Sequence, residues 1–391
     1  MKFKEFEFCP ELMQGIEAMG YEEATPIQVQ AIPIIMEGRD LLASAQTGTG
    51  KTAAFLLPII EKILSAKADG HIQALIIVPT RELAVQIDQN MEALSYFTHV
   101  NSIAVYGGSA GDTFSREQKA LSEGADVVIC TPGRMIAHLI MGYVKVAELK
   151  YLILDEADRM LDMGFNEDIA KIISYLPAKR QNLMFSATMP VKIKHLAKNI
   201  LHNQAEISLA LSKPAEKVLQ AAYILHDGQK IAFVKYILTR KVQKSVLIFC
   251  STKEKTKQLS RELRKTKLAV DEIHSDLDQQ TRERVLMAFK NKSLNILVAT
   301  DIMSRGIDVE DIDMVINYDV PRDGEDYIHR IGRTARAASD GLAFTLVNEK
   351  DQYNFSKIEE LLGKPVYKDR VPEEFGPTPA YSPKKSFHKR K

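Results

Sequence analysis

Short apolar runs alternate with stretches of helical periodicity along most of the chain, and the alternation occurs in two series. Such runs are typical of strands in a parallel sheet, and the helical stretches between them supply the crossovers. The pattern therefore predicts an α/β protein with two domains, each a mainly parallel sheet flanked by helices. The predicted strands are 41–43, 74–78, 103–106, 127–130, 152–154 and 183–185 in the first series, and 246–250, 270–273, 296–298, 314–317 and 343–347 in the second.

A polar segment with a central proline, residues 210–217, separates the two series and is interpreted as a linker. The length of 391 residues also favours two domains, here predicted as residues 1–209 and 218–365. Residues 366–391 are rich in proline and charge and end in a basic cluster, which predicts a disordered tail. The tail is interpreted either as an arm that attracts RNA or as a solubilising terminus.

The composition narrows the class of protein. Lys plus Arg total 52 and Asp plus Glu total 51, so any site for a polyanion must come from local placement of arginines. The three cysteines, Cys9, Cys130 and Cys250, form no C-x-x-C pair, which argues against a structural zinc site or a disulfide framework. The N-terminus lacks a signal-peptide pattern, and no apolar run has the length of a membrane span. We therefore expect a cytoplasmic protein without a membrane partner.

The segment 45–52, A-Q-T-G-T-G-K-T, carries the strongest chemical signal. It departs from the phosphate-loop pattern G-x-x-x-x-G-K-[ST] only at Ala45, which is still small enough for a tight turn. Because it lies between a predicted strand and a predicted helix, its amides would converge on phosphate oxygens at the helix N-terminus. Lys51 would contact the β and γ phosphates, and Thr52 would ligate Mg²⁺. The alternative is a glycine-rich turn that caps an ordinary helix. The predicted nucleotide-binding residues are Ala45, Gln46, Thr47, Gly48, Thr49, Gly50, Lys51 and Thr52.

An acidic segment, D-E-A-D at 155–158, directly follows the apolar run 151–154. Carboxylates at the carboxyl end of a buried parallel strand lie where open α/β sheets bind ligands. Asp155 would hold Mg²⁺ through its water shell, and Glu156 would orient or deprotonate an attacking water. The alternative is a solvated helix start. Together with the phosphate loop, the segment predicts a site that hydrolyses a nucleoside triphosphate.

The second series has no phosphate loop, but it has a basic segment, H-R-I-G-R-T-A-R at 329–336. Arg330, Arg333 and Arg336 are spaced by three, which predicts that they lie near one another at a helix start or on one helix face. Guanidinium groups are permanently charged and fork-shaped, so they suit phosphate stabilisation from outside the loop. An arginine finger from the second domain would make hydrolysis depend on domain closure. The alternative is a solvated basic helix.

From residue 3 to about residue 365 the chain resembles the DEAD-box RNA helicases of superfamily two, because these motifs and several others stand in the family order. The resemblance implies two tandem RecA-like domains. Residues 20–28 are similar to the Q motif, in which the glutamine, here Gln28, reads adenine, although Ala24 replaces the usual proline. Phe3 stands where the family has an adenine-stacking aromatic ring. The implied nucleotide is therefore ATP.

The resemblance also implies an RNA site in the first domain, at segments 79–83, 107–108 and 131–134. Each follows a predicted strand, so all three emerge at the same carboxyl edge of the sheet. Hydroxyls, glycine amides and arginines there would bind the sugar-phosphate backbone, which implies little sequence preference. Taken alone, T-P-G-R at 131–134 is a turn that leads into a helix. The implied RNA-binding residues are Pro79, Thr80, Arg81, Gly107, Gly108, Thr131, Pro132, Gly133, Arg134 and, in the second domain, Thr300.

Two further sets of residues are assigned by the resemblance. Ser186 and Thr188 belong to an S-A-T segment that resembles the motif coupling hydrolysis to strand separation, although Ser and Thr also favour helix N-caps. In the second domain, residues 246–252 resemble motif IV and residues 299–308 resemble motif V, while Ala335 and Ser275 replace usual glycines. The remaining implied roles are Gly306 and Asp308 at the ribose, Arg333 and Arg336 at the γ-phosphate, and Asp158, His329 and Arg330 in coupling.

The resulting hypothesis is a closure cycle, in which ATP and single-stranded RNA favour a closed form of the two domains. Hydrolysis would then be stimulated by RNA, and short duplexes would be unwound locally. Two alternatives stay open: an ATP-gated RNA clamp without productive unwinding, and a related enzyme that acts on DNA. The expected partners are RNA and proteins of ribosome assembly or RNA decay, and the chain is expected to be a monomer.

Overall fold

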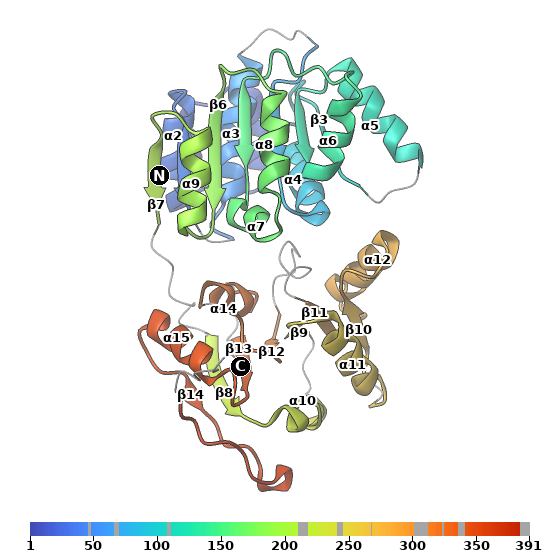
Figure 1. The fold of residues 1–391 in the computed structure, drawn as a ribbon. Coiled ribbons are helices and arrows are strands. Elements are labelled where there is room, and N and C mark those ends of the chain that lie inside the picture. The colour runs from blue at the N-terminus through green and yellow to red at the C-terminus, as the bar shows by residue number, and fades with distance from the viewer. Residues whose placement is uncertain are drawn as a thin grey trace, which may run out of the picture. The chain divides into compact units, whose positions relative to one another are not determined.

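The computed structural model describes residues 1–45, 48–65, 70–107, 111–209, 218–240, 245–266, 268–300, 312–322, 324–334 and 341–383. The chain divides into two compact units, Met1–Leu211 and Ser212–Lys391, which are considered one at a time (Figure 1). Gln46, Thr47, Gly108, Gly306, Asp308 and Arg336, which the sequence marks as site residues, lie outside the described residues, as do the predicted linker 210–217 and residues 384–391.

The described strands of the first unit form one seven-stranded sheet in the order β3-β4-β2-β5-β6-β1-β7. The pairings between these described strands are parallel; for example, Leu41 lies opposite Leu183 on one side and Ala205 on the other. All carboxyl ends therefore lie at one edge, where ligands bind in such sheets. The strands are β1 (Leu41–Ser44), β2 (Ala74–Ile77), β3 (Ser102–Val105), β4 (Val127–Cys130), β5 (Tyr151–Leu154), β6 (Gln181–Ser186) and β7 (Ala205–Ser208).

Helices cover both faces of this sheet. Successive strand residues point to opposite sides, so each strand contacts helices on both faces. In β1, Leu41 and Ala43 join an apolar cluster with residues of α1 to α4, whereas Leu42 joins a cluster with residues of α6 to α9. The strands are thus buried on both faces, which explains their uninterrupted apolar runs. The helices are η1 (Phe3–Phe6), α1 (Pro10–Ala18), α2 (Pro26–Met36), α3 (Lys51–Leu64), α4 (Arg81–Leu94), α5 (Gly111–Glu123), α6 (Pro132–Ile140), α7 (Ala157–Asp162), α8 (Asn166–Ser174) and α9 (Val191–Ile200).

The second unit repeats this topology. Its described strands form a seven-stranded sheet in the order β10-β11-β9-β12-β13-β8-β14, which is the order of the first sheet with seven added to each strand number. The pairings between these described strands are again parallel. The strands are β8 (Val218–Ile224), β9 (Val246–Cys250), β10 (Val270–Ile273), β11 (Ile296–Thr300), β12 (Met314–Asn317), β13 (Gly341–Val347) and β14 (Tyr367–Lys368).

The helices of the second unit also lie on both faces of the sheet. Val246 and Ile248 pack in a cluster with residues of α10 and α11, whereas Leu247 and Phe249 pack on the other face with residues of α12. The predicted fold class is therefore confirmed in both units. The helices are α10 (Asp227–Arg240), α11 (Lys253–Arg264), α12 (Gln279–Lys290), α14 (Gly324–Ile331), α15 (Gln352–Leu362) and η2 (Glu373–Phe375).

The segment after residue 365 differs from the prediction. A disordered tail was expected from residue 366, but residues 366–383 follow the surface of the second unit through β14 and η2. The ring of Phe375 packs 5.4 Å from that of Phe233, and Tyr381 donates a hydrogen bond of 2.5 Å to Glu359. The prediction is wrong for these residues because scattered aromatic side chains, invisible to an argument from average composition, attach the segment to the core.

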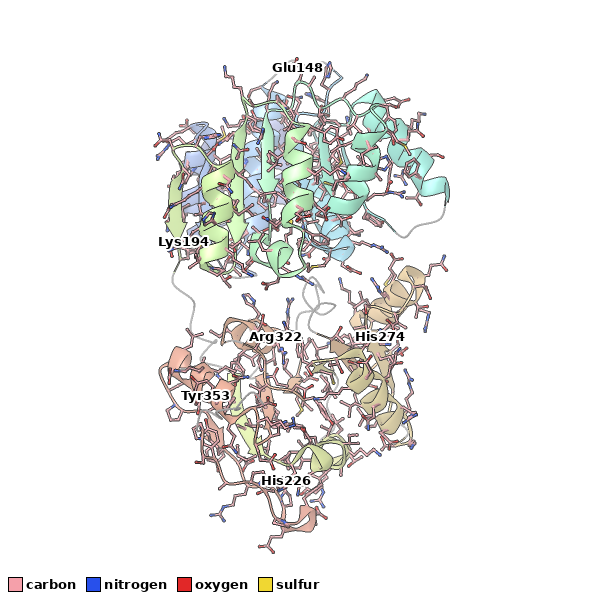
Figure 2. All side chains as sticks on the ribbon, in the orientation of Figure 1. Glu148, Lys194, His226, His274, Arg322 and Tyr353 are labelled. Carbon is pink, nitrogen blue, oxygen red and sulfur yellow. The ribbon has the colours of Figure 1, made fainter. Side chains whose placement is uncertain are left out.

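The surface carries charged side chains of both signs, in keeping with the balanced composition. Glu148 and Lys194 are exposed on the first unit and Arg322 on the second (Figure 2). Among the described residues, no helix combines the length and the apolar character that crossing a membrane requires.

Candidate nucleotide and RNA site

The phosphate loop joins β1 to α3, as the sequence predicts. Gly50 is the N-cap of α3 with φ of 90°, a left-handed conformation that side chains rarely adopt. A Cβ atom there would lie 2.5 Å from Nε2 of Gln28, so only glycine fits. Gly48 also has a positive φ, of 80°. The described part of the loop thus has the tight turn that a phosphate cradle requires.

Lys51, the first residue of α3, is the most informative side chain of the loop. It is only 6% exposed, yet its Nζ atom has no hydrogen-bond partner among the described residues. A buried, unpaired ammonium is costly, and an anion would compensate it. Thr52 follows at the start of the same helix and is half-buried. The local structure therefore fits a polyphosphate that approaches the N-terminus of α3.

Asp155 lies directly after β5 and is 3% exposed. Burial raises the pKa of this carboxyl to about 6; the ammonium of Lys51 opposes the shift, and the charges of Glu156 and Asp158 add to it. The charge of Lys51 does not offset the burial of this carboxyl and its acidic neighbours, and a divalent cation would supply further positive charge. Asp155 and Thr52 are thus suited to hold Mg²⁺.

Glu156 has an unusual backbone conformation for a non-glycine residue, with φ of 50°. Its amide donates a 2.9 Å hydrogen bond to Oδ1 of Asp155, and its carboxylate accepts a 3.1 Å hydrogen bond from Nη1 of Arg159. These contacts hold the turn between β5 and α7 and fix the direction of the Glu156 side chain. The spacing of Arg159 gave no signal in the sequence.

The residues predicted to couple hydrolysis to strand separation are partly brought together. Oδ2 of Asp158 accepts a 3.0 Å hydrogen bond from the amide of Thr188, and the Ser186 hydroxyl donates a 2.7 Å hydrogen bond to the Thr188 carbonyl. The loop after β6 is therefore attached to α7, which begins beside Asp155.

Gln28 connects the phosphate loop to the start of α2. Its Oε1 accepts a 2.8 Å hydrogen bond from the amide of Thr25, and its Nε2 donates a 3.1 Å hydrogen bond to the carbonyl of Gly50. A T-x-x-Q capping box was thus a sequence signal for this position. Phe3 is 3% exposed and stacks on Tyr21 with ring centroids 6.0 Å apart. The adenine contacts of Gln28 and Phe3 stay predictions, because these groups are engaged within the protein here.

The predicted RNA-binding segments of the first unit lie side by side at one edge of the sheet, since they follow the adjacent parallel strands β3, β4 and β2. Pro79 is buried, and Thr80 caps α4 by accepting a 3.3 Å hydrogen bond from the amide of Leu83. A Cβ atom on Gly107 would lie 3.8 Å from Nη2 of Arg81, so these two segments are near neighbours.

The third segment, 131–134, forms the N-terminus of α6. Thr131 is the N-cap but makes no side-chain cap hydrogen bond, Pro132 occupies the first turn, and Gly133 is exposed. Arg134 points elsewhere: its Nε donates a 2.7 Å hydrogen bond to the buried carboxylate of Glu117. The structure thus separates Arg134 from the other residues of this segment.

The basic segment of the second unit does not have the predicted geometry. Arg330 lies in the last turn of α14, which ends at Ile331, so Arg333 lies beyond the helix and cannot share a helix face with it. The prediction of one helix face or a helix start is wrong because the chain turns at Gly332 and Thr334 pairs with Ile312 in an isolated bridge. The Thr334 hydroxyl also donates to the Ile312 carbonyl.

Arg330 is buried within the second unit. Its Nη1 donates hydrogen bonds of 3.1 Å to Oδ1 of Asn317 and 2.9 Å to the carbonyl of Asp319. His329 precedes it in α14, and Thr300 ends β11 as a half-buried residue. In the described residues Arg330 therefore organises its own unit, and its predicted coupling between domains stays a prediction.

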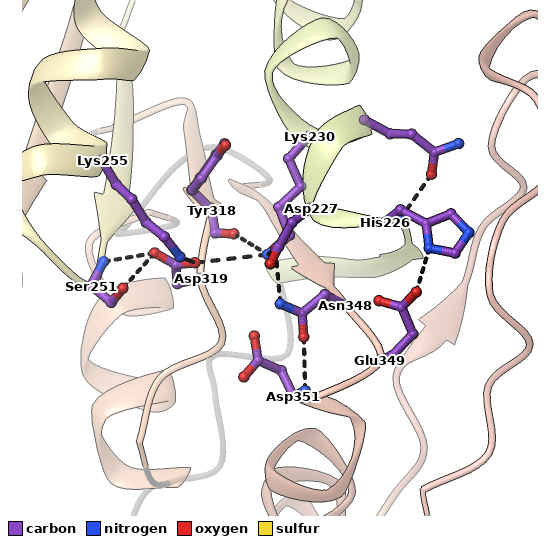
Figure 3. A network of polar contacts seen from close by, with 11 residues as sticks. His226, Asp227, Lys230, Ser251, Lys255, Tyr318, Asp319, Asn348, Glu349 and Asp351 are labelled. Carbon is purple, nitrogen blue, oxygen red and sulfur yellow. Dashed lines mark hydrogen bonds and ion pairs between the residues drawn. The ribbon is translucent and has the colours of Figure 1, made fainter.

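A second buried lysine and aspartate, which the sequence did not reveal, lie at the carboxyl edge of the second sheet (Figure 3). Nζ of Lys230, in the first turn of α10, donates a 3.0 Å hydrogen bond to the carbonyl of Tyr318 and lies 3.7 Å from Oδ1 of Asp319. Asp319 also accepts hydrogen bonds of 2.6 Å from Lys255 and 2.8 Å from the amide of Ser251. Lys230 and Lys255 thus both have Asp319 as a partner of opposite charge (Figure 3).

The fold and the site place the chain in the class of phosphate-loop proteins with two similar α/β units. The family model of the DEAD/DEAH box helicase matches residues 25–196, and that of the helicase conserved C-terminal domain matches residues 229–338. The chain belongs to the DEAD-box ATP-dependent RNA helicases, which confirms the resemblance seen in the sequence.

Relatives and solved structures agree with this family. The ATP-dependent RNA helicase CshA of Listeria monocytogenes is 40% identical over 364 residues, which cover 93% of this chain and 69% of the relative. The ATP-dependent RNA helicase DbpA of Bacillus subtilis is 36% identical over 373 residues, covering 95% and 77%. The structure of S. cerevisiae Dbp5 bound to RNA and ADP BeF3 has a TM-score of 0.84 and 30% identity, and covers 95% of each chain.

Proposed function

We propose that this chain is an RNA-stimulated ATPase that binds single-stranded RNA with little sequence preference and locally unwinds short RNA duplexes. The observation that carries the proposal is the buried Nζ of Lys51, which has no partner among the described residues and lies near the buried carboxylate of Asp155. The RNA-bound structures of Dbp5 and Mss116 support the choice of RNA. Membership of the helicase family supports the choice of ATP.

In this proposal the first unit holds the triphosphate. Lys51 neutralises phosphate charge, the amides around Gly50 orient the phosphates, and Gln28 exchanges its bond to the Gly50 carbonyl for the adenine. Asp155 and Thr52 would hold Mg²⁺, which would offset the charge that develops in phosphoryl transfer. The left-handed turn at Glu156 keeps its carboxylate ready to orient or deprotonate the attacking water.

The second unit is proposed to complete the site. Arg333 and Arg336 would stabilise the γ-phosphate, as an arginine finger does, when ATP and RNA favour a closed arrangement of the two units. RNA would bind through Thr131, Gly133 and their neighbours. The hydrogen bond between Thr188 and Asp158 would couple the loop after β6 to the nucleotide site at Asp155. We further propose that the chain acts as a cytoplasmic monomer, with partners from ribosome assembly or RNA decay.

The variant Glu156→Gln tests the catalytic core of this proposal. It should bind ATP and RNA like the wild type but lose RNA-stimulated hydrolysis by on the order of a hundredfold or more, since general-base catalysis contributes about 10² to 10⁴. The measurement is the rate of phosphate release with saturating ATP and RNA. Glu167→Gln, the same change at an exposed residue of α8, is the matched control. Normal hydrolysis by Glu156→Gln would contradict the role of Glu156.

Two further measurements separate the alternatives. Stimulation of the wild type by RNA and by DNA of the same sequence distinguishes an RNA enzyme from a DNA enzyme. A strand-displacement assay on a short duplex distinguishes a helicase from an ATP-gated clamp, because a clamp hydrolyses ATP without releasing the strand. Stimulation by DNA alone would overturn the proposed substrate.

A further inference from the structure

The carboxylate of Glu117, on α5, joins the two neighbouring segments that are proposed to bind RNA. Glu117 is 1% exposed. Its Oε1 accepts a 3.4 Å hydrogen bond from the amide of Tyr106, the residue before Gly107. Its Oε2 accepts a hydrogen bond of 2.7 Å from Nε of Arg134 and lies 2.9 Å from Nε2 of His138, both on α6. One side chain thus connects the end of β3 to the helix that follows β4.

Both carboxylate oxygens of Glu117 accept hydrogen bonds within a largely buried group of side chains. The ring of His138 is fully buried and stacks on Phe114, with centroids 4.5 Å apart and planes inclined by 17°. Both ring nitrogens of His138 are engaged, Nε2 with the Glu117 carboxylate and Nδ1 with the Tyr143 hydroxyl. The guanidinium of Arg134, 4.5 Å from the Phe114 ring, then balances the single negative charge of Glu117. Such a network fixes the positions of its members.

Arg134 is therefore used differently from the residues beside it. Its side chain is 16% exposed, Nε is engaged by Glu117, and Nη2 is buried without a partner among the described residues. By contrast, Gly133 is exposed and Thr131 makes no side-chain cap hydrogen bond. A phosphate can reach the Thr131 hydroxyl and the first amides of α6 more readily than the guanidinium.

We infer that Glu117 is a positioning residue, which sets the N-terminus of α6 against the end of β3 through Arg134 and Tyr106, and that Arg134 positions this RNA-binding edge without contacting phosphate itself. This inference rests on the proposed RNA-stimulated ATPase. It predicts the sign of a mutational effect, because a phosphate-binding arginine and a positioning arginine respond in opposite ways to the loss of Glu117.

The variant Glu117→Gln distinguishes the two roles. It keeps the shape of the side chain but removes the negative charge. An amide NH₂ group placed in the position of Oε2 would face the N–H group of Arg134 and could not accept its hydrogen bond. For a positioning arginine, the half-saturating RNA concentration for ATPase stimulation should rise roughly three- to tenfold, while kcat at saturating RNA and the KM for ATP stay at wild-type values. For a phosphate-binding arginine, the released guanidinium should leave that concentration unchanged or lower it.

Two controls make the result specific. Glu123→Gln makes the same charge change on the exposed end of α5, so it reports the general electrostatic effect, and thermal unfolding reports the integrity of the fold. Arg134→Lys keeps a point charge but loses the Nε geometry, so it should weaken RNA binding as Glu117→Gln does, and the double variant should be no weaker than either single one.

Additive effects, or a Glu117→Gln variant that binds RNA as well as Glu123→Gln does, would overturn the inference. If RNA neither bound to the wild-type chain nor stimulated its ATP hydrolysis, the proposed function would be overturned, and the inference with it.

Discussion

The two sheets share one strand order, and each carries a buried lysine after its first strand and a buried aspartate after the fifth. In the first unit these are Lys51 and Asp155, and in the second they are Lys230 and Asp319. Their surroundings differ: Nζ of Lys51 has no hydrogen-bond partner among the described residues, whereas Nζ of Lys230 donates to the Tyr318 carbonyl (Figure 3).

The two aspartates differ in the same way. Burial raises the pKa of Asp155 to about 6. Burial acts on Asp319 too, but hydrogen bonds from Lys255 and the Ser251 amide, together with the charge of Lys230, hold its pKa below the usual range. The same topology thus places a buried lysine and a buried aspartate at one edge of each sheet. In the second unit they form an ion pair with each other, whereas in the first unit Nζ of Lys51 has no hydrogen-bond partner among the described residues.

The largest effect is expected from Lys51→Met. Without the ammonium, ATP hydrolysis should fall on the order of a thousandfold, as is common when a charged group that stabilises the transition state is removed. The free energy of unfolding without nucleotide should not fall, because no hydrogen bond to the described residues is lost and the cost of burying the ammonium is removed. Phosphate release and urea unfolding followed by circular dichroism measure the two quantities. Hydrolysis within tenfold of the wild type would end the assignment of Lys51.

The matched change in the second unit, Lys230→Met, should have the opposite profile. It breaks a buried network and should lower the free energy of unfolding by about 3 kcal/mol, since removing one partner leaves the others uncompensated. ATP affinity, which depends on the first unit, should remain unchanged, as equilibrium binding of a fluorescent ATP analogue would show. If Lys230→Met lost ATP affinity without losing stability, the two lysines would not differ as the comparison states.

Replacing the aspartates should give pH dependences of opposite sign. Asp155 has a pKa of about 6 when folded and an ordinary value of 3.8, so between these values the folded state holds more protons and stability falls as the pH rises. Asp155→Asn removes this loss and should be more stable than the wild type above pH 6, by at most about 3 kcal/mol at 1.36 kcal/mol per pKa unit. The gain should vanish near pH 4.

Asp319→Asn is the control for that experiment. Because the folded-state pKa of Asp319 is lowered, its contribution is present above its unfolded value and is lost as the pH falls through the lower folded value. The variant should therefore be less stable than the wild type at pH 7, and the difference should shrink in strong acid. Urea unfolding from about pH 2 to pH 8 measures both variants. If the stability of the two variants, relative to the wild type, depended on pH in the same way, the stated difference between the two aspartates would be wrong.

The sequence predicted those parts of each unit that depend on neighbouring residues. Continuous apolar runs marked strands such as β4 and β9, and the phosphate loop and the D-E-A-D segment lie after β1 and β5 as expected. Strands β7, β8 and β14 were not predicted. Two of them lie at the sheet edge, and β8 mixes exposed with buried residues, including Leu219 at 61% exposure, so its pattern has no single period.

Contacts between distant residues escaped the sequence analysis altogether. Lys230 and Asp319 approach each other because α10 and the end of β12 lie at the same edge of the sheet. Their spacing along the sequence does not predict this pair. Arg134 was assigned to RNA from its motif, while its partner Glu117 lies 17 residues away along the chain. The end of α14 before Arg333 depends on the bridge between Thr334 and Ile312, another long-range contact.

The last prediction concerns the segments next to the seventh strand of each sheet, because these segments differ between the two units. β7 precedes residues 210–217, whereas β14 lies in the C-terminal segment expected to be a tail. Because the ring of Phe375 contacts Phe233 and Tyr236, with centroids 5.4 and 5.3 Å away, Phe375→Ala should lower the free energy of unfolding by about 1 kcal/mol. A truncation that removes only residues 384–391 should, by contrast, leave the free energy of unfolding unchanged. If these residues tether RNA, their loss should still raise the half-saturating RNA concentration, whereas Phe375→Ala should not. If the truncation lost stability and kept its RNA affinity, the last residues would belong to the fold and the tether would be excluded.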